Sequence, residues 1–382
     1  MRIALLLDDS MDRPDGVQQF VTSLGHTLVA AGHEVVVVCS AGSDGEDGDP
    51  AAAGGLPVVP LARNMGVSFN GNRLRTPLPA DKARIRAWLE EFRPDVIHVQ
   101  TPHSPAFAGR VVREARRVLG DSVRIVGTFV ILPDGGFSAA STRALGAALR
   151  GNLKRFDAFS ALSEPAADFA RKTFGIECIV TPHPIPVDGF RAQARLDRLP
   201  DEQRPLTLSF LGRFVPRKGV LEFIEAIDAL PREVHPYIRV RMAGRGPLLD
   251  KARRLIASKF LRGVISLEGY LPESDKAQFL HDADLAVFPA MSGESFGIVV
   301  AEAMAAGAGV VIGGDNPGYR YVLQDEAVLV DPKDTAAFAR TLTTLLADPA
   351  ERTRIHEAQQ LRVRDFDVPA VYAGIMELYG VR

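Results

Sequence analysis

Apolar residues along this chain form short continuous runs that alternate with amphipathic segments. In the first half the strand-like runs are RIALLL at 2–7, EVVVVCS at 34–40, DVIHVQ at 95–100 and VRIVGTFV at 123–130. Apolar residues at helical spacing indicate helices at 17–31 and 105–119. Continuous apolar strands that alternate with helices predict a parallel sheet covered by helices on both faces.

The same alternation restarts after a polar segment, VDGFRAQARLDRLPDEQRP, at residues 187–205. Five more strand candidates follow it: LTLSFLG, YIRVRMAG, VISLEG, DLAVFPA and GVVIGG. We predict an α/β protein with two Rossmann-like domains, 1–186 and 206–366, joined by the polar segment as a linker. Open parallel sheets bind ligands at the carboxyl ends of their strands, so we expect the two domains to face each other across a ligand-binding cleft. A last helix within 367–382 is expected to pack back on the N-terminal domain.

Composition narrows the function classes. A formal net charge of -2 gives no reason to expect nucleic acid, and 46% hydrophobic residues exclude a disordered chain. The apolar runs are too short to cross a bilayer, and residues 1–7 lack the features of a signal peptide. Cys39 and Cys178 suggest neither a disulfide framework nor a zinc site. We therefore expect a cytoplasmic protein.

Two carboxylates stand in the largely apolar segment GESFGIVVAEAMAAG at 293–307. Glu302 lies among apolar neighbours, where an ionised side chain is costly unless it is paired or hydrogen-bonded. Two interpretations stay open for it: an internal salt bridge on a partly exposed helix, or hydrogen bonds to ligand hydroxyls such as a ribose diol. Glu294 follows a strand and lies beside a helix N-terminus, where it would meet the same ligand near its phosphates.

Cations follow another strand in FLGRFVPRKG at 210–219. Arg213 and Lys218 in this loop can neutralise a diphosphate, although unrelated surface charges are the alternative. Arg217 is interpreted as a solvated bystander.

Glycines mark two further candidate phosphate loops. Gly244 and Gly246 in AGRGP allow close approach of a ligand to the backbone, or form a tight turn and nothing more. The loop at 8–20 leads into a helix at Gly16, whose free N–H groups could cradle a phosphate. This first turn lacks the G-x-G-x-x-G spacing, which counts against a nicotinamide-dependent oxidoreductase.

Together these segments resemble the retaining glycosyltransferases of family four, which have the GT-B fold, and among them the phosphatidylinositol mannosyltransferase-like enzymes. The resemblance rests on DRPDGVQ, DVIHVQTPHSP, FLGRFVPRKG, AGRGP and the E-x7-E pair formed by Glu294 and Glu302. It implies transfer of a hexose, with mannose as a candidate, from a GDP- or UDP-linked sugar to a lipid or polyol acceptor. It also implies that neither a metal nor another cofactor is needed.

The resemblance further implies a role for individual residues. Glu302 would bind the ribose and Glu294 the hydroxyls of the transferred sugar, while Arg213 and Lys218 would stabilise the leaving diphosphate. Donor contacts would also come from Gly16, Gly244, Gly246 and the backbone N–H groups of Phe296 and Gly297. The base would lie against residues 267–275. Acceptor contacts would come from Gln18 and from Asn64 and Arg73 in a predicted loop at 64–79.

Three positions depart from the family pattern. Val130 stands where the family often has a histidine that contacts the donor, Asp15 replaces the first glycine of a pair, and His183 replaces an asparagine. They motivate an alternative function, a nucleotide-sugar-binding protein that has lost transfer activity.

Basic residues suggest where the acceptor side would meet an anionic membrane. The predicted helix at 80–92 carries Lys82, Arg84, Arg86 and Trp88, and related enzymes have a lipid-docking helix at about this place. A solvated helix face is the alternative, and residues 141–156 form a second basic candidate. We expect peripheral association with the inner face of the cell membrane, or else a soluble acceptor such as a sugar phosphate or cyclitol.

Overall fold

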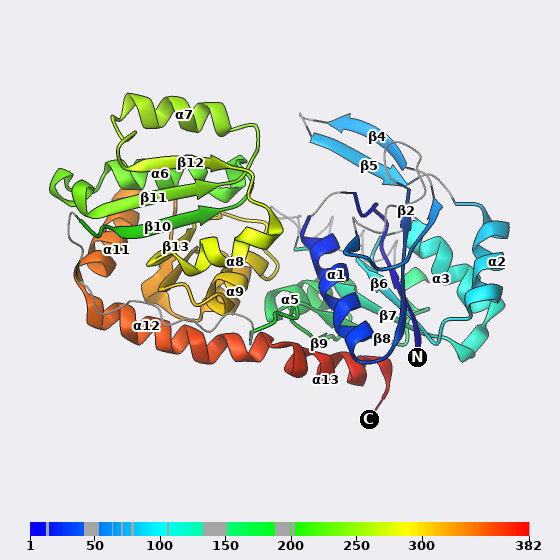
Figure 1. The fold of residues 1–382 in the computed structure, drawn as a ribbon. Helices are drawn as coiled ribbons and strands as arrows, with labels where there is room; N and C mark the ends of the chain where they lie inside the picture. Colours follow the sequence, from blue (N-terminus) through cyan, green and yellow to red (C-terminus); the bar gives the residue numbers. More distant parts are fainter. Residues whose placement is uncertain are drawn as a thin grey trace. The chain divides into compact units, whose positions relative to one another are not determined.

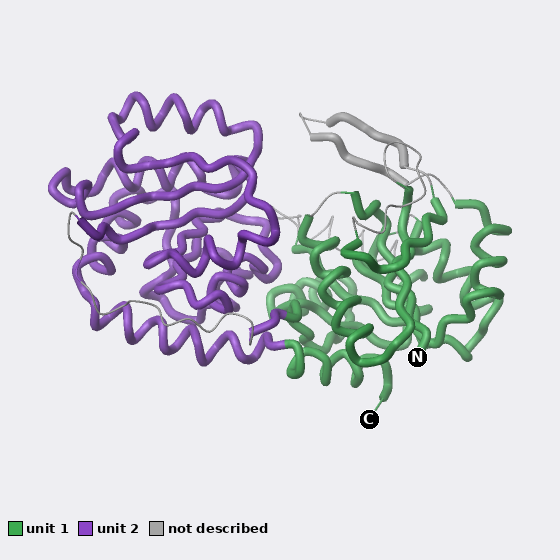
Figure 2. Tube along the Cα trace, in the orientation of Figure 1, with its two compact units in different colours: residues 1–184, 368–382 green, residues 185–367 purple. Residues whose placement is uncertain are grey.

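The computed structural model describes residues 1–12, 15–41, 53–62, 64–69, 72–77, 80–104, 107–132, 151–187, 199 and 203–381, with 64–69 and 72–77 described by their backbone alone. The chain forms two compact units (Figure 2). The first contains Met1–Pro184 and Val368–Arg382, and the second contains Ile185–Asp367. Within the described residues, no helix is both long enough and apolar enough to cross a membrane.

A seven-stranded parallel sheet forms the centre of the first unit, in the order β3-β2-β1-β6-β7-β8-β9 (Figure 1). Its strands are β1 (Arg2–Leu6), β2 (Glu34–Ser40), β3 (Val58–Ala62), β6 (Val96–Gln100), β7 (Arg124–Phe129), β8 (Ala158–Ala161) and β9 (Ile179–Val180). The helices are α1 (Gly16–Ala30), α2 (Lys82–Phe92), α3 (Phe107–Val118), α5 (Glu164–Phe174) and α13 (Val368–Tyr379). The contacts of α2 with α3, and of α1 with α13, place helices in two layers around the sheet.

The second unit contains a six-stranded parallel sheet in the order β12-β11-β10-β13-β14-β15. Its strands are β10 (Leu206–Leu211), β11 (Ile238–Ala243), β12 (Ile265–Gly269), β13 (Leu285–Phe288), β14 (Val310–Gly314) and β15 (Leu329–Val330). The helices are α6 (Val220–Asp228), α7 (Leu249–Ser258), α8 (Glu273–His281), α9 (Ile298–Ala305), α10 (Pro317–Leu323), α11 (Thr335–Ala347) and α12 (Pro349–Arg362). The predicted pair of helix-covered parallel sheets is confirmed.

Each sheet has a topological switch point. The strands that directly follow the first strand in sequence lie on one side of it, and the later strands lie on its other side. This point lies between β1 and β6 in the first unit and between β10 and β13 in the second. Loops at the carboxyl ends of the two strands flank a crevice at such a point, which is where open α/β sheets bind ligands. In the second unit these are the loops that carry Lys218 and Glu294.

The predicted loop at 64–79 is wrong. Its backbone forms two antiparallel strands, β4 (Asn64–Phe69) and β5 (Asn72–Pro77), in which Phe69 pairs with Asn72. The sequence between the strands is Asn-Gly, a strong signal for a two-residue hairpin that the prediction overlooked.

The final helix, α13, belongs to the first unit. The Tyr379 hydroxyl lies 2.9 Å from Nδ1 of His98 on β6, and Nε2 of His98 lies 2.5 Å from Oγ1 of Thr128 on β7. Arg124 Nε donates to the carbonyl of Leu378 at 2.9 Å. The last turn of α13 therefore provides hydrogen-bond partners for polar side chains of β6 and β7.

Candidate active site

A three-residue ionic cluster lies at the switch point of the second unit. Glu294, in the loop after β13, accepts from Arg217 Nη1 at 2.6 Å and from Lys218 Nζ at 2.8 Å, both at Oε1. Arg217 and Lys218 belong to the short 3-10 helix Pro216–Lys218 after β10. The structure thus brings two of the predicted catalytic residues, Lys218 and Glu294, into direct contact. The interpretation of Arg217 as a solvated bystander is wrong, because its side chain pairs with Glu294.

Burial of the ammonium lowers the pKa of Lys218 below its ordinary value. Glu294 opposes this shift, whereas the positive charges of Arg217 and Arg213 add to it. The exposed Arg213 therefore belongs to the same electrostatic environment as Lys218. Arg217 and Lys218 share one carboxylate, and Arg213 adds positive charge near Lys218; such a group of cations suits a diphosphate.

The glycines of AGRGP have a packing role of their own. A Cβ at Gly244 would lie 1.8 Å from the carbonyl oxygen of Gly212, and one at Gly246 would lie 2.5 Å from that of Phe214. Both glycines have positive φ values, 141° and 155°. Only glycine fits such close backbone contact in this conformation. The two predicted donor-binding glycines therefore hold the loop after β11 against the loop that contains Arg213.

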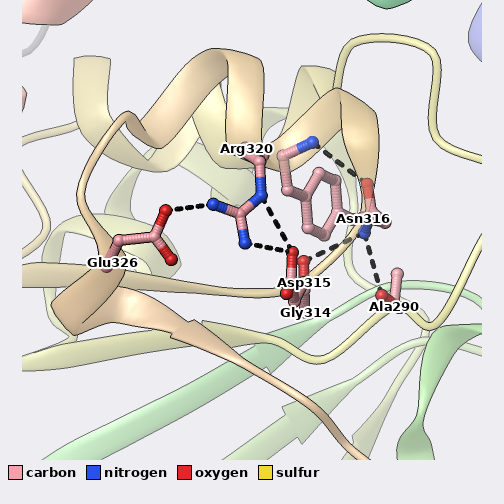
Figure 3. A network of polar contacts seen from close by, with 7 residues as sticks. Ala290, Gly314, Asp315, Asn316, Arg320 and Glu326 are labelled. Atoms are coloured by element: carbon pink, nitrogen blue, oxygen red, sulfur yellow. Dashed lines mark hydrogen bonds and ion pairs between the residues drawn. The ribbon is translucent and has the colours of Figure 1, made fainter.

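Asn316, the N-cap residue of α10, binds the start of the loop that later contains Glu294, and Figure 3 shows its bonds to Ala290 and Gly314. Asn316 Nδ2 donates to the carbonyls of Ala290 at 2.9 Å and Gly314 at 3.1 Å, and its Oδ1 accepts from Tyr319 N at 3.0 Å. The side chain is buried, so these bonds tie the ends of β13 and β14 together. Sequence reasoning did not single out Asn316, although Asn before Pro at a helix start is a recognisable capping signal.

Glu302 pairs with Lys276, which lies on α8. Their Oε1 and Nζ atoms are 2.6 Å apart, and Lys276 also lies 2.5 Å from Oε1 of the exposed Glu273. Burial raises the pKa of Glu302 above its ordinary value, and Lys276 opposes that shift. The internal salt bridge, one of the two interpretations left open for Glu302, is therefore present. With a side chain that is still 21% exposed, Glu302 is also able to meet a ligand.

Phe296 and Gly297 lie where Glu294 leads into α9. Gly297, three residues after Glu294, is the N-cap residue of α9, and the N–H groups at the start of a helix lack the partners that interior ones have. The Phe296 side chain is buried and packs 5.0 Å, ring to ring, from Phe366. Only its backbone is available to a ligand. In residues 267–275, which are predicted to lie against the nucleotide base, Tyr270 is exposed. The guanidinium of Arg245 lies 4.9 Å from the centre of its ring.

On the first unit, Gly16 begins α1, and Asp15 precedes it as the N-cap residue. Gln18 is buried and its Nε2 donates to the carbonyl of Ser10 at 3.0 Å, which fixes the loop after β1. Asn64 and Arg73 lie on β4 and β5, and their side chains fall outside the described residues.

Val130 directly follows β7 and is buried. The sequence reasoning overlooked His103, in the loop after β6, whose ring stacks on Phe129 at 5.6 Å. Burial lowers the pKa of His103 to about 4, so this imidazole is neutral at pH 7. His183, the third departure from the family pattern, is also buried and lies 5.8 Å, ring to ring, from Phe20.

The predicted membrane helix is α2, and its basic residues differ in environment. Lys82 and Arg84 are exposed. Arg86 Nε donates to the buried carboxylate of Glu114 at 2.7 Å. Trp88 is buried against Phe92, with ring centres 5.7 Å apart, so its side chain is not available for the predicted membrane contact. Most of the second basic candidate, 141–156, lies outside the described residues.

Known families match both units of the chain. Residues 15–178 match the glycosyl transferase 4-like domain, and residues 194–362 match glycosyl transferases group 1. The phosphatidyl-myo-inositol mannosyltransferase of Mycobacterium tuberculosis is 32% identical, over 99% of this chain and 96% of that protein. This chain belongs to the family-four glycosyltransferases. The glycogen synthase of the same organism is 29% identical over 95% of this chain and 90% of its own length.

A solved structure has the same fold as this family-four glycosyltransferase. Anabaena HepE (Alr3699), solved with UDP, superimposes with a TM-score of 0.74 at 17% identity and full coverage of both chains. The GT-B fold expected from the sequence is confirmed. The protein is a retaining hexosyltransferase that uses a nucleotide-sugar.

Proposed function

We propose that this family-four glycosyltransferase moves a hexose, with mannose as the first candidate, from a GDP- or UDP-linked donor to a polyol-headed lipid. The cluster of Glu294, Arg217 and Lys218 at a switch point carries the proposal, because it offers a carboxylate for sugar hydroxyls beside cations for a diphosphate. The choice of mannose and of a lipid acceptor rests on the mannosyltransferase named above.

In the proposed reaction, Lys218 and Arg213 neutralise the negative charge that develops on the departing diphosphate. The first turn of α9 would add backbone N–H groups near its oxygens, and Gly16 remains a proposed donor contact of the first unit. Glu302 would hold the ribose and Glu294 the hydroxyls of the transferred sugar. The leaving phosphate would take the acceptor proton during front-face attack, so no side chain is assigned as a general base. Gln18, Asn64 and Arg73 remain the proposed acceptor side.

Release of nucleoside diphosphate from a panel of GDP- and UDP-sugars tests the proposal. We expect one donor to be consumed and E294Q to lose on the order of 100-fold or more in rate, as for loss of an oriented contact with the reacting group. Glu233→Gln, an exposed glutamate of the same unit, is the matched control and should keep full activity. Equal rates for wild type and E294Q would refute the assignment of this site.

Buried Val130 favours a second candidate, a nucleotide-sugar-binding protein without transfer activity. It predicts that calorimetry detects GDP or UDP binding while no donor turns over with phosphatidylinositol, free inositol or a sugar phosphate. Product formation at ordinary enzymatic rates would eliminate this candidate.

A further inference from the structure

Arg217 is attached to the loop of Glu294 at more than one point. Its Nη1 donates to Glu294 Oε1 at 2.6 Å and, at the limit of a hydrogen bond, to the carbonyl of Ser292 at 3.5 Å. Its own carbonyl accepts from Met291 N at 2.8 Å. Backbone and side chain of Arg217 therefore fasten three neighbouring positions of the loop that presents Glu294.

Lys218 is bound differently, although it reaches the same carboxylate oxygen. Its ammonium is a compact charge on a flexible stem, whereas the guanidinium of Arg217 is a planar fork suited to a carboxylate. The Lys218 side chain is only 16% exposed, and two arginine charges add to the burial that disfavours its charged form. An incoming diphosphate would supply two or more negative charges to this ammonium, which is a stronger partner than one shared carboxylate.

We infer that Arg217 is the permanent counter-ion and positioning residue of Glu294, while Lys218 exchanges from Glu294 to the donor diphosphate. The inference rests on the role proposed for Glu294 as a contact to the transferred sugar. Asn316 holds the Glu294 loop at Ala290, and Arg217 holds it at Met291, Ser292 and Glu294. With both supports in place, Glu294 keeps its position and its charge when Lys218 turns to the phosphates.

Variants R217Q and R217K test whether Arg217 positions Glu294 or instead binds the donor. The measurements are kcat and KM for the donor that wild type consumes, the Kd of GDP and UDP by calorimetry, and the melting temperature. We expect R217Q to lower kcat on the order of 10- to 100-fold, as for a small misplacement of a reacting group. Its donor KM and nucleoside diphosphate Kd should stay within about threefold of wild type. R217K, which keeps the charge, should recover part of kcat.

The controls distinguish a failure of this inference from a failure of the proposed function. R253Q removes an exposed arginine that pairs with Asp250 in the same unit, and it should behave as wild type. If E294Q is inactive while R217Q keeps wild-type kcat, the inference is overturned and the role of Glu294 stands. If R217Q weakens diphosphate binding as much as it lowers kcat, Arg217 is a donor ligand and the positioning role is overturned. Wild-type activity in E294Q would refute both the proposed role of Glu294 and the inference about Arg217.

Discussion

At the scale of single residues, Glu294 and Glu302 of the second unit are each paired with specific cations. Glu302 has one close partner, Lys276, and lies on a helix whose other residues are mostly apolar. A buried ion pair is weak support for stability, because desolvation of both charges offsets their attraction. The raised pKa of Glu302 shows that desolvation outweighs Lys276 here. The Lys276–Glu302 pair is therefore expected to contribute little to the stability of the fold.

This balance gives a pH-dependent prediction for E302Q. A carboxyl whose pKa is raised in the folded state stabilises the fold most below its ordinary value of 4.5 and loses that contribution as pH rises through the folded pKa. As pH rises, wild type should therefore lose this contribution to stability, whereas E302Q has no carboxyl at this position to titrate. The melting temperature of E302Q relative to wild type should therefore be higher at about pH 8 than at about pH 5, while its affinity for GDP and UDP falls. A pH-independent difference would contradict the prediction.

At the scale of elements, helices α2 and α3 share a buried carboxylate. Glu114 is 1% exposed and pairs with Arg86 at 2.7 Å and with Arg117 at 2.6 Å. The two arginines lower the pKa of Glu114 against the cost of burial. Arg86 therefore contributes to the packing of α2 on α3, whereas Lys82 and Arg84 are exposed on α2 and remain available to an anionic surface.

Neutralising Lys82 and Arg84 together tests the proposed membrane contact. At about 1 kcal/mol per cation, K82Q/R84Q should bind anionic vesicles roughly 30-fold more weakly than wild type. Its melting temperature should not change. R86Q, by contrast, should lower the melting temperature because it removes a partner of a buried carboxylate. Co-sedimentation with phosphatidylserine vesicles, and with phosphatidylcholine as the neutral control, measures the binding. Unchanged sedimentation of K82Q/R84Q would exclude α2 as the contact.

At the scale of the whole molecule, the chain leaves the first unit, builds the second, and returns to the first as α13. His98 is fully buried, and burial lowers its pKa to about 3, so the ring is neutral and needs a partner for each nitrogen. Tyr379 and Thr128 provide those partners. The stability of the first sheet thus depends on residues at the far end of the sequence.

The variant Y379F tests this dependence. It leaves one nitrogen of His98 without a partner, which should cost about 1–3 kcal/mol of the free energy of unfolding. Y372F is the matched control: Tyr372 bonds the less buried His33 at 3.0 Å, where water can replace the hydroxyl, so its effect should be smaller. Thermal and denaturant unfolding of both variants measure the difference. Equal stabilities would show that the Tyr379 hydroxyl is dispensable.

The sequence alone determined the strands at the centre of both sheets and the glycosyltransferase family to which the chain belongs. Runs such as 35–40 and 310–314 are buried on both faces, so their apolar character is continuous and local. Short or edge strands escaped this reasoning: β9 and β15 have two residues each, and β3 contains Pro60. Their strand conformation depends on a neighbouring strand more than on their own composition.

Only the tertiary structure decided which charges meet. Arg217 and Glu294 are 77 positions apart, and Lys276 and Glu302 are 26 apart, so no helical or strand period relates them. The order of strands brings β10 beside β13 and thereby selects Arg217 as a partner rather than a bystander. Residue types fix which interactions are chemically available, whereas the long-range pairing of strands fixes which of them form.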